Sequence, residues 1–228
     1  MTRLLALLAL LLVGPAQAAV DAEQLRAQGR AALDALVARS AALPARDQAI
    51  LAVVRAPSEG VAESTLESLS AWREQHPDDL SAKLYEGYGW LFMAGEYVKR
   101  QNYFRAAELA KRGFFLMDEA VDQNPEDWRL RLLRARMDCY VPAEFGRHVV
   151  ALKDLRYLQE HPEQVPAELH PLVDFLQARA LRAAGDETAA KTLAEQTPWS
   201  ELLGSTERLP ITRAEVERVL TPIMEAAP

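Results

Sequence analysis

Apolar residues recur every three or four positions through most of this 228-residue chain, and short breaks separate the periodic stretches. Such spacing places the apolar side chains on one face of an α-helix. The breaks at His76–Asp79, Asn124–Asp127 and His161–Gln164 each combine a proline with acidic residues. Proline ends a helix, and acidic residues favour the start of the next one. The pattern predicts an all-α fold of about 8–10 helices arranged as repeated antiparallel hairpins.

The first 60 residues predict two helices that follow an N-terminal targeting segment. A helix is expected over Asp21–Ser40 and a shorter one over Asp47–Arg55, followed by a loop at Ala56–Gly60. Ser64 and Glu67 then form a capping-box pattern that opens the next helix. Pro77 ends that helix.

The centre of the chain predicts a pair of longer helices. The first is expected over Asp79–Ala94, with Gly87 and Gly89 inside it. Glycine within a helix costs about 1 kcal/mol relative to alanine, so these glycines indicate close approach of a neighbouring helix. A turn is expected at Gly95–Tyr97, and the second helix from about Tyr103 to Gln123.

Three segments resemble the tetratricopeptide repeat, a family of helical hairpins. In the first, the large, small and aromatic positions and the turn correspond to Leu84, Gly87, Tyr88, Leu91 and Gly95-Glu96-Tyr97. The second begins at Asp127 and has Leu130, Leu133 and Met137 on one face. The third matches best and comprises Leu176, Ala178, Leu181, the Gly185-Asp186 turn and Ala190. The resemblance covers roughly residues 79–196 and implies a right-handed superhelical array, a tetratricopeptide-like α-solenoid. Other arrays of α-helical hairpins share these motifs and stay open as an alternative.

Three departures from the family pattern mark the centre of the array. They are an insertion near Glu96–Phe104, a long loop at Pro142–Arg147, and Arg134 where the family prefers a small residue. The predicted domains are a signal peptide (1–18), a helical hairpin or cap (19–60), the repeat domain (61–200) and a C-terminal tail (201–228). In the tail, Thr212 and Glu215 form a capping box for a last helix that Pro222 limits.

The first 18 residues are typical of a secretory signal. Arg3 precedes an apolar run from Leu4 to Val13, and Ala16-Gln17-Ala18 supplies small residues for cleavage. We therefore expect a mature chain that starts at Ala19 and lies in the bacterial periplasm or outside the cell, without stable membrane insertion. An uncleaved N-terminal anchor is the alternative. The apolar run is short of the ~20 residues that span a bilayer.

Charge and residue types argue against several classes of function. The net charge is −7, which disfavours nucleic acid as a partner because phosphate neutralisation needs clustered cations. The single cysteine, Cys139, allows no internal disulfide and is expected to be a buried small side chain. The sequence shows no metal-ligand spacing, phosphate-binding loop or nucleophile motif, so no cofactor and no enzymatic activity are expected.

A partner-binding surface is expected where such arrays form a concave groove. The resemblance places aromatic and charged residues there: Tyr85, Phe92, Trp128, Arg131, Asp138, Phe175, Arg179 and Arg182. Aromatic residues and arginines are enriched at interface hot spots. The alternative is that these side chains belong to the core or to solvated ion pairs. The loop residues Phe145 and Arg147 form a second candidate surface, unless Phe145 tucks under its hairpin.

The leading functional hypothesis is an exported, non-enzymatic scaffold that binds a protein or peptide in the bacterial cell envelope. Formation of a homo-oligomer stays open. The alternative is an accessory or ligand-carrying subunit of a periplasmic transport system, with an apolar pocket near Tyr88, Trp90 and Phe92. An open groove favours the scaffold, whereas an enclosed cavity lined by aromatic residues favours the carrier.

Overall fold

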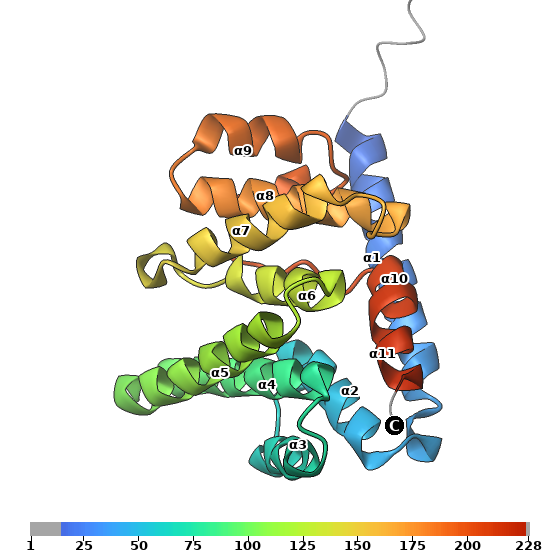
Figure 1. Ribbon diagram of the computed structural model, residues 1–228. Helices are drawn as coiled ribbons and strands as arrows, with labels where there is room; N and C mark the ends of the chain where they lie inside the picture. Colours follow the sequence, from blue (N-terminus) through green and yellow to red (C-terminus); the bar gives the residue numbers. More distant parts are fainter. Residues whose placement is uncertain (1–14, 227–228) are drawn as a thin grey trace, which may run out of the picture.

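Stacked antiparallel helix pairs form the body of the protein in the computed structural model, which describes the backbone of residues 15–226 and side chains from residue 23 onward (Figure 1). Within that part of the chain every regular element is helical, which confirms the predicted all-α class. The main helices are α1 (Pro15–Val37), α2 (Ala45–Glu59), α3 (Glu63–Gln75), α4 (Leu80–Lys99), α5 (Tyr103–Gln123), α6 (Trp128–Asp138), α7 (Arg147–Glu160), α8 (His170–Ala183), α9 (Glu187–Ala194), α10 (Arg213–Glu215) and α11 (Thr221–Glu225).

Short helical segments connect several of these helices. Single 3₁₀ turns occupy η1 (Ser40–Ala42), η2 (Ala143–Phe145), η3 (Ala167–Leu169) and η4 (Ser200–Leu202). A π-helical segment, η5 (Val216–Leu220), joins α10 to α11. Pro222 explains this widening, because proline has no amide hydrogen to donate to the carbonyl four residues earlier.

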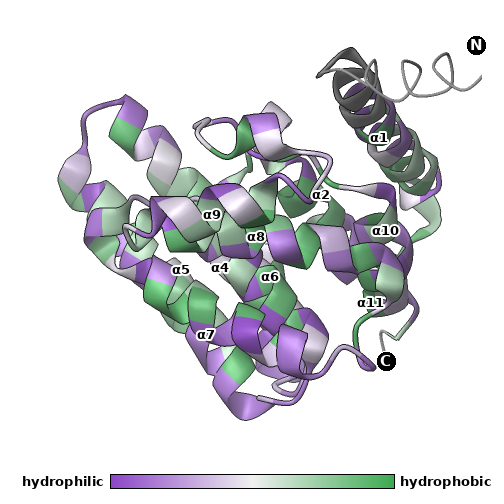
Figure 2. Ribbon diagram, turned by 90° about the horizontal axis from the view of Figure 1, so that it is seen from above, coloured by the Kyte–Doolittle hydropathy of each residue, from purple (hydrophilic) through white to green (hydrophobic). Residues whose placement is uncertain are grey.

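The hairpins α4–α5, α6–α7 and α8–α9 are stacked, and both ends of the chain run across one side of the stack (Figure 1). There α1 packs beside α10 and η5. Viewed from above in Figure 2, α6 and α8 lie between α5 and α7 on one side and α1, α10 and α11 on the other. The C-terminal helices contribute Val216, Val219, Leu220 and Ile223 to the same core as the hairpins. The tail is therefore built into the body of the protein.

The helices α4 and α5 cross at two glycines. A Cβ atom added at Gly87 would lie 2.8 Å from the carbonyl oxygen of Gly113, and one at Gly113 would lie 2.7 Å from that of Gly87. Only a residue without a side chain permits this approach. The predicted role of Gly87 is thus confirmed. Gly89 serves the same purpose toward α3, since a Cβ there would lie 2.1 Å from Leu66 Cδ2.

Aspartates cap the helices that follow two of the three proline-containing breaks, and a third aspartate caps α9, whereas the break at His161–Gln164 supplies no cap. The side chains of Asp79, Asp127 and Asp186 each accept a hydrogen bond from a backbone amide in the first turn of α4, α6 and α9. Such caps satisfy amides that have no partner within the helix. The capping box of Thr212 and Glu215 is present as predicted. The predicted helix Tyr103–Gln123 is also confirmed, and so is the turn at Gly185-Asp186.

Two predictions for the region before α4 are wrong. The expected loop at Ala56–Gly60 is instead the last turn of α2, which continues through Pro57 and ends at Gly60 with φ of 77°. The helix α3 begins at Glu63 after Ala62, so the Ser64/Glu67 pattern does not cap it. Ser64 already lies inside the helix, where Ser68 Oγ donates to its carbonyl oxygen.

The predicted turn at Gly95–Tyr97 is also wrong. The helix α4 continues to Lys99, and the chain turns at Arg100–Asn102, where Gln101 adopts φ of 59°. Tyr97 packs on the core from the added turn of α4, and Asn102 caps α5. The predicted insertion near Glu96–Phe104 is therefore extra length in α4 and not a separate helix. Pro222 likewise does not end the last helix, which runs on through α11 to Glu225.

The predicted signal peptide lies outside the described residues for positions 1–14, and α1 runs across the predicted cleavage point at residues 18 and 19. Over the part of the chain that the structure describes, no helix combines the length and the hydrophobicity that crossing a bilayer requires.

Candidate functional site

Most of the residues predicted for a concave groove are buried. Phe175 is completely buried and packs edge-on against Trp199, with ring centroids 5.9 Å apart. Trp128 is 8 % exposed at the start of α6. Tyr85 is buried and Phe92 is half-buried on α4. These aromatic side chains are therefore part of the protein interior, and their role in partner binding remains a prediction.

Two arginines of the predicted groove bind the C-terminal segment of the same chain, which we define as residues 202–220. Arg179 Nη1 donates to the carbonyl oxygens of Leu202 (2.9 Å) and Ser205 (3.1 Å). Arg182 Nη1 donates to that of Leu203 (3.2 Å) and its Nε to Glu187 (3.1 Å). This segment thus lies along α8 and binds it through backbone carbonyls.

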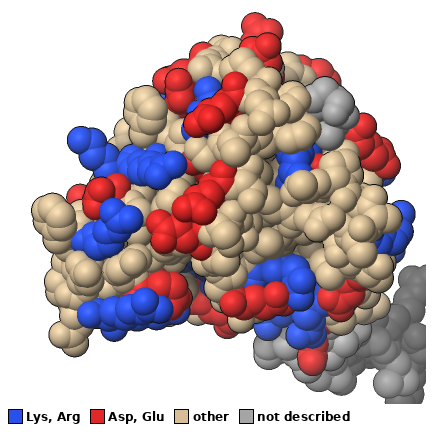
Figure 3. Space-filling model, turned by 90° about the horizontal axis from the view of Figure 1, so that it is seen from below, with Lys and Arg blue, Asp and Glu red and all other residues tan. Residues whose placement is uncertain are grey.

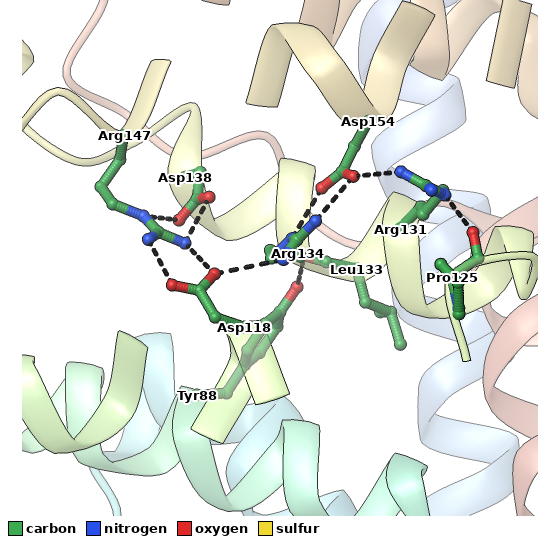
Figure 4. A network of polar contacts seen from close by, with 9 residues as sticks. All are labelled: Tyr88, Asp118, Pro125, Arg131, Leu133, Arg134, Asp138, Arg147 and Asp154. Atoms are coloured by element: carbon green, nitrogen blue, oxygen red, sulfur yellow. Dashed lines mark hydrogen bonds and ion pairs between the residues drawn. The ribbon is translucent and has the colours of Figure 1, made fainter. Parts of the chain in front are cut away.

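The other predicted charged residues belong to one ion-pair network between α5, α6 and α7 (Figure 4). Asp154 accepts hydrogen bonds of 2.8 Å from Arg131 and from two nitrogens of Arg134. Arg147 binds both oxygens of Asp138 at 2.8 and 2.9 Å and both oxygens of Asp118 at 2.8 Å. Arg134 also reaches Asp118 at 3.2 Å, which joins the two halves. Three arginines thus meet three aspartates, a net charge of 3 − 3 = 0.

Because the charged groups of this network are paired with one another, we interpret the network as a structural element. Arg131 uses a further donor on the carbonyl oxygen of Pro125 (2.6 Å), and its guanidinium lies 4.0 Å from the ring centroid of Tyr157. Burial raises the pKa of Asp138 to about 7, and Arg147 opposes that rise. Buried charges are tolerated when partners satisfy them, and little hydrogen-bonding capacity is left here for a ligand.

The loop between α6 and α7 carries an exposed aromatic side chain. Phe145 is 62 % exposed and Val149, one turn into α7, is 63 % exposed. Gly146 between them has φ of 69°, a left-handed conformation that glycine adopts readily. Arg147 ties the loop to α5 through Asp118. The structure therefore presents Phe145 to solvent from an anchored loop.

A cavity of about 510 Å³ lies between the stack and the two chain ends. Pockets for drug-sized ligands occupy roughly 300–1,000 Å³. Its lining comes from α1, α2, α4, α6 and the C-terminal segment: Arg30, Leu33, Val54, Arg55, Pro57, Ser58, Tyr85, Tyr88, Phe92, Leu132, Leu133, Arg136, Met137, Glu207, Arg208, Leu209, Pro210, Ile211, Glu215, Val219 and Leu220. The exposed residues of this lining are Arg30, Pro57, Ser58 and Glu207.

Polar groups on one wall of the cavity hold the C-terminal segment in place. Arg136 of α6 forms an ion pair with Glu215 and donates to the carbonyl oxygens of Leu209 (3.0 Å) and Pro210 (3.2 Å). Burial opposes the charge of Arg136, but Glu215 outweighs it and raises the pKa. The hydroxyl of Tyr88 donates to the carbonyl oxygen of Leu133 (Figure 4). Burial raises the pKa of Tyr88 well above its usual value, so this hydroxyl stays protonated.

Arg208 of the C-terminal segment also lines the cavity, but unlike Arg136 it has no ion-pair partner among the described side chains. Its guanidinium lies 5.1 Å from the ring centroid of Phe92 and 5.3 Å from that of Tyr140, and Nη1 is 3.3 Å from Met137 Sδ. Among side chains 23–226 no carboxylate is within 4.0 Å of it. Burial, and then the nearby Arg136, lower its pKa.

Other parts of the described structure offer weaker sites. A hollow of about 680 Å³ near Arg46, Asp79 and Pro222 is larger, but loop residues line much of it. There Arg46 is already bound to Asp79 at 2.9 Å. Cys139 is buried as predicted, and its Sγ is 3.2 Å from the carbonyl oxygen of Leu176. The described residues contain no cluster of three metal-ligating side chains.

The sequence predicted some of the residues that line the cavity but not others. Tyr88 and Phe92 had been expected near a pocket and do line it, whereas Trp90 instead donates to Glu86 at 3.0 Å. Arg136 and Arg208 were missed because no motif marks them, and Glu215 was identified only as a capping residue. The available signal was that the tail combines Arg208 with the capping pair Thr212 and Glu215.

Comparisons of the chain with models of known families, with curated proteins and with solved structures found no match.

Proposed function

We propose that this protein is an exported helical-repeat protein that binds a small, largely apolar molecule in the cavity between its hairpins and its chain ends. The carrier hypothesis fits the geometry better than an open-groove scaffold does. The partly enclosed cavity of about 510 Å³, lined in part by Tyr85, Tyr88 and Phe92, is the observation that supports it. Its place of action is proposed to be the bacterial periplasm or cell envelope, as the N-terminal sequence indicates.

The arrangement of the helices supports a tetratricopeptide-like array as part of this proposal. Successive hairpins pack on one another, and the second helices α5 and α9 each begin at a side-chain cap. In the proposed right-handed superhelix, the chain ends lie along the concave side and convert a groove into a partly enclosed cavity. Ligand entry would then occur beside the exposed residues of the lining, which are Arg30, Pro57, Ser58 and Glu207.

Calorimetric titration with decanol tests the proposal, because this probe is apolar and uncharged. Wild-type protein is expected to bind it, and Val54→Trp on the α2 wall is expected to abolish binding by filling the cavity. Val149→Trp places the same side chain at an exposed position of α7, outside the cavity, and should bind as wild type does. Absence of decanol binding by the folded wild-type protein would reject the cavity function.

A second candidate function is the scaffold hypothesis, with a protein or peptide partner held at the α6–α7 loop. The exposed side chains of Phe145 and Val149 favour it, since adjacent exposed apolar groups on a fixed loop are typical of contact surfaces. Basic and acidic side chains are interspersed over the face seen from below in Figure 3. Envelope extracts passed over wild-type and Phe145→Ser protein should yield a partner only with wild type.

The proposed export is tested separately by cell fractionation and N-terminal sequencing. The expected mature N-terminus is Ala19. Recovery of the protein in the cytoplasm with its first residues intact would contradict the proposed location.

A further inference from the structure

We propose that the cavity selects an aliphatic carboxylate, whose head group is bound by Arg208. The inference rests on the proposed cavity function and adds the chemical class of the ligand. It is carried by the placement of Arg208, a guanidinium that lines an apolar cavity without a carboxylate partner among side chains 23–226.

The charges around the cavity match an anion. Its lining includes four basic residues, Arg30, Arg55, Arg136 and Arg208, and two acidic ones, Glu207 and Glu215, which gives 4 − 2 = +2. The chain as a whole carries −7. Arg55 pairs with Glu59 outside the lining, and Arg136 pairs with Glu215 within it. Arg208 is therefore the inner cation whose charge the described structure leaves uncompensated.

The contacts of Arg208 leave its hydrogen-bonding capacity largely unused. The guanidinium faces the rings of Phe92 and Tyr140, and its single polar contact is Met137 Sδ, a weak acceptor. An arginine placed for structure donates to carboxylates or carbonyls, as Arg136 and Arg179 do in the same region. A planar guanidinium with free N–H groups matches the two oxygens of a carboxylate.

The remaining lining matches a hydrocarbon body. Leu33, Val54 and Leu132 contribute aliphatic surface from three helices, and the C-terminal segment adds Leu209, Ile211, Val219 and Leu220. Burial also lowers the pKa of Arg208, the direction expected for a cation that is partly removed from water. Arginine stays protonated at neutral pH nevertheless. A ligand with one anionic end and an aliphatic chain satisfies both kinds of surface.

The test compares two probes that differ only in the head group, decanoate and decanol, in calorimetric titrations of the purified protein. We expect wild type to bind decanoate roughly 10- to 100-fold more tightly than decanol, the range of one charge-assisted contact. Arg208→Met should remove this preference while decanol affinity stays the same. Arg208→Lys keeps the charge and should retain part of the preference.

Arg213→Met is the matched control, because Arg213 lies near the cavity on α10 but pairs with Glu217 on the surface. It should bind both probes as wild type does. Equal affinity of wild type for decanoate and decanol would overturn the inference and leave the cavity function standing. Binding of neither probe would overturn both. Undiminished decanoate preference in folded Arg208→Met would also reject the role of Arg208, with circular dichroism showing that the variant is folded.

Discussion

Two arginine-rich regions of this protein differ in whether their charges are balanced. Between α5, α6 and α7, Arg131, Arg134 and Arg147 meet Asp118, Asp138 and Asp154, and every guanidinium has a carboxylate at 2.8 Å (Figure 4). In the cavity, Arg136 is paired with Glu215 but Arg208 has only aromatic rings and a thioether beside it. Arginine thus occurs in two settings, one with carboxylate partners and one without.

Arginines with and without carboxylate partners contribute differently to the fold. A saturated arginine links helices, and removal of its partner leaves an uncompensated charge. An unsaturated arginine adds little to the fold and retains hydrogen-bond donors for another molecule. Residue type and burial do not separate the two cases, whereas the list of hydrogen-bond partners does.

The largest effect is expected from Asp154→Ala in the saturated network. Arg131 and Arg134 would lose their shared carboxylate in the interior, at a cost of about 3–5 kcal/mol in the free energy of unfolding. Urea denaturation measures this change. Glu217→Ala is the control, because its pair with Arg213 is exposed and should be worth less than about 1 kcal/mol. Similar losses in the two variants would show that the network is not structural.

A much smaller effect on stability is expected from Arg208→Met. No carboxylate within reach is left unpaired, and the lost contacts are with Phe92 and Tyr140. The free energy of unfolding should change by less than about 1 kcal/mol, in either direction. Urea denaturation alongside Asp154→Ala makes the comparison direct. Destabilisation as large as that of Asp154→Ala would place Arg208 among the structural arginines.

The last prediction concerns stability in acid and a third group of paired charges, Arg46 and Asp79. Burial opposes the charge of Asp79, but hydrogen bonds from Arg46, the Ala82 amide and Trp72 outweigh it and lower the pKa. Because the folded state then binds protons less readily than the unfolded state, Asp79 stabilises the protein above its unfolded pKa. That contribution is lost as pH falls through the lower folded pKa.

Denaturation of wild type and Asp79→Asn at a series of pH values measures this contribution. Wild type should be the more stable protein above about pH 5, and the difference should shrink toward about pH 2. A difference that stays constant over this range would show that Asp79 acts by capping α4 alone and not by its charge.

Sequence periodicity predicted most helices and some of their ends. Caps with a local chemical signature were predicted correctly, as at Thr212 and Gly185-Asp186, because the stabilising contacts lie within a few residues. Ends that depend on distant packing were not. Gly95 was interpreted as a turn, but α4 continues because Tyr97 packs on the core and Asn102 starts α5.

The candidate site was predictable only in part. Tyr88 and Phe92 were expected near a pocket because aromatic residues cluster on α4, and both line the cavity. Arg131, Asp138 and Arg147 were expected on a surface, yet they are tied into the network with Asp118 and Asp154. Their carboxylate partners lie up to 29 residues away in the sequence, beyond any local pattern.

Helix period, prolines and capping residues act locally, so the amino-acid sequence alone was enough to predict an all-α protein with antiparallel helix pairs. Gly87 in the sequence also indicated close approach of a neighbouring helix, which is α5. The sequence did not reveal that α1 packs beside α10, that Arg136 binds the C-terminal segment, or that Arg208 has no carboxylate partner among side chains 23–226. These features depend on contacts between side chains that are far apart in the sequence, and such contacts are determined by how the helices pack.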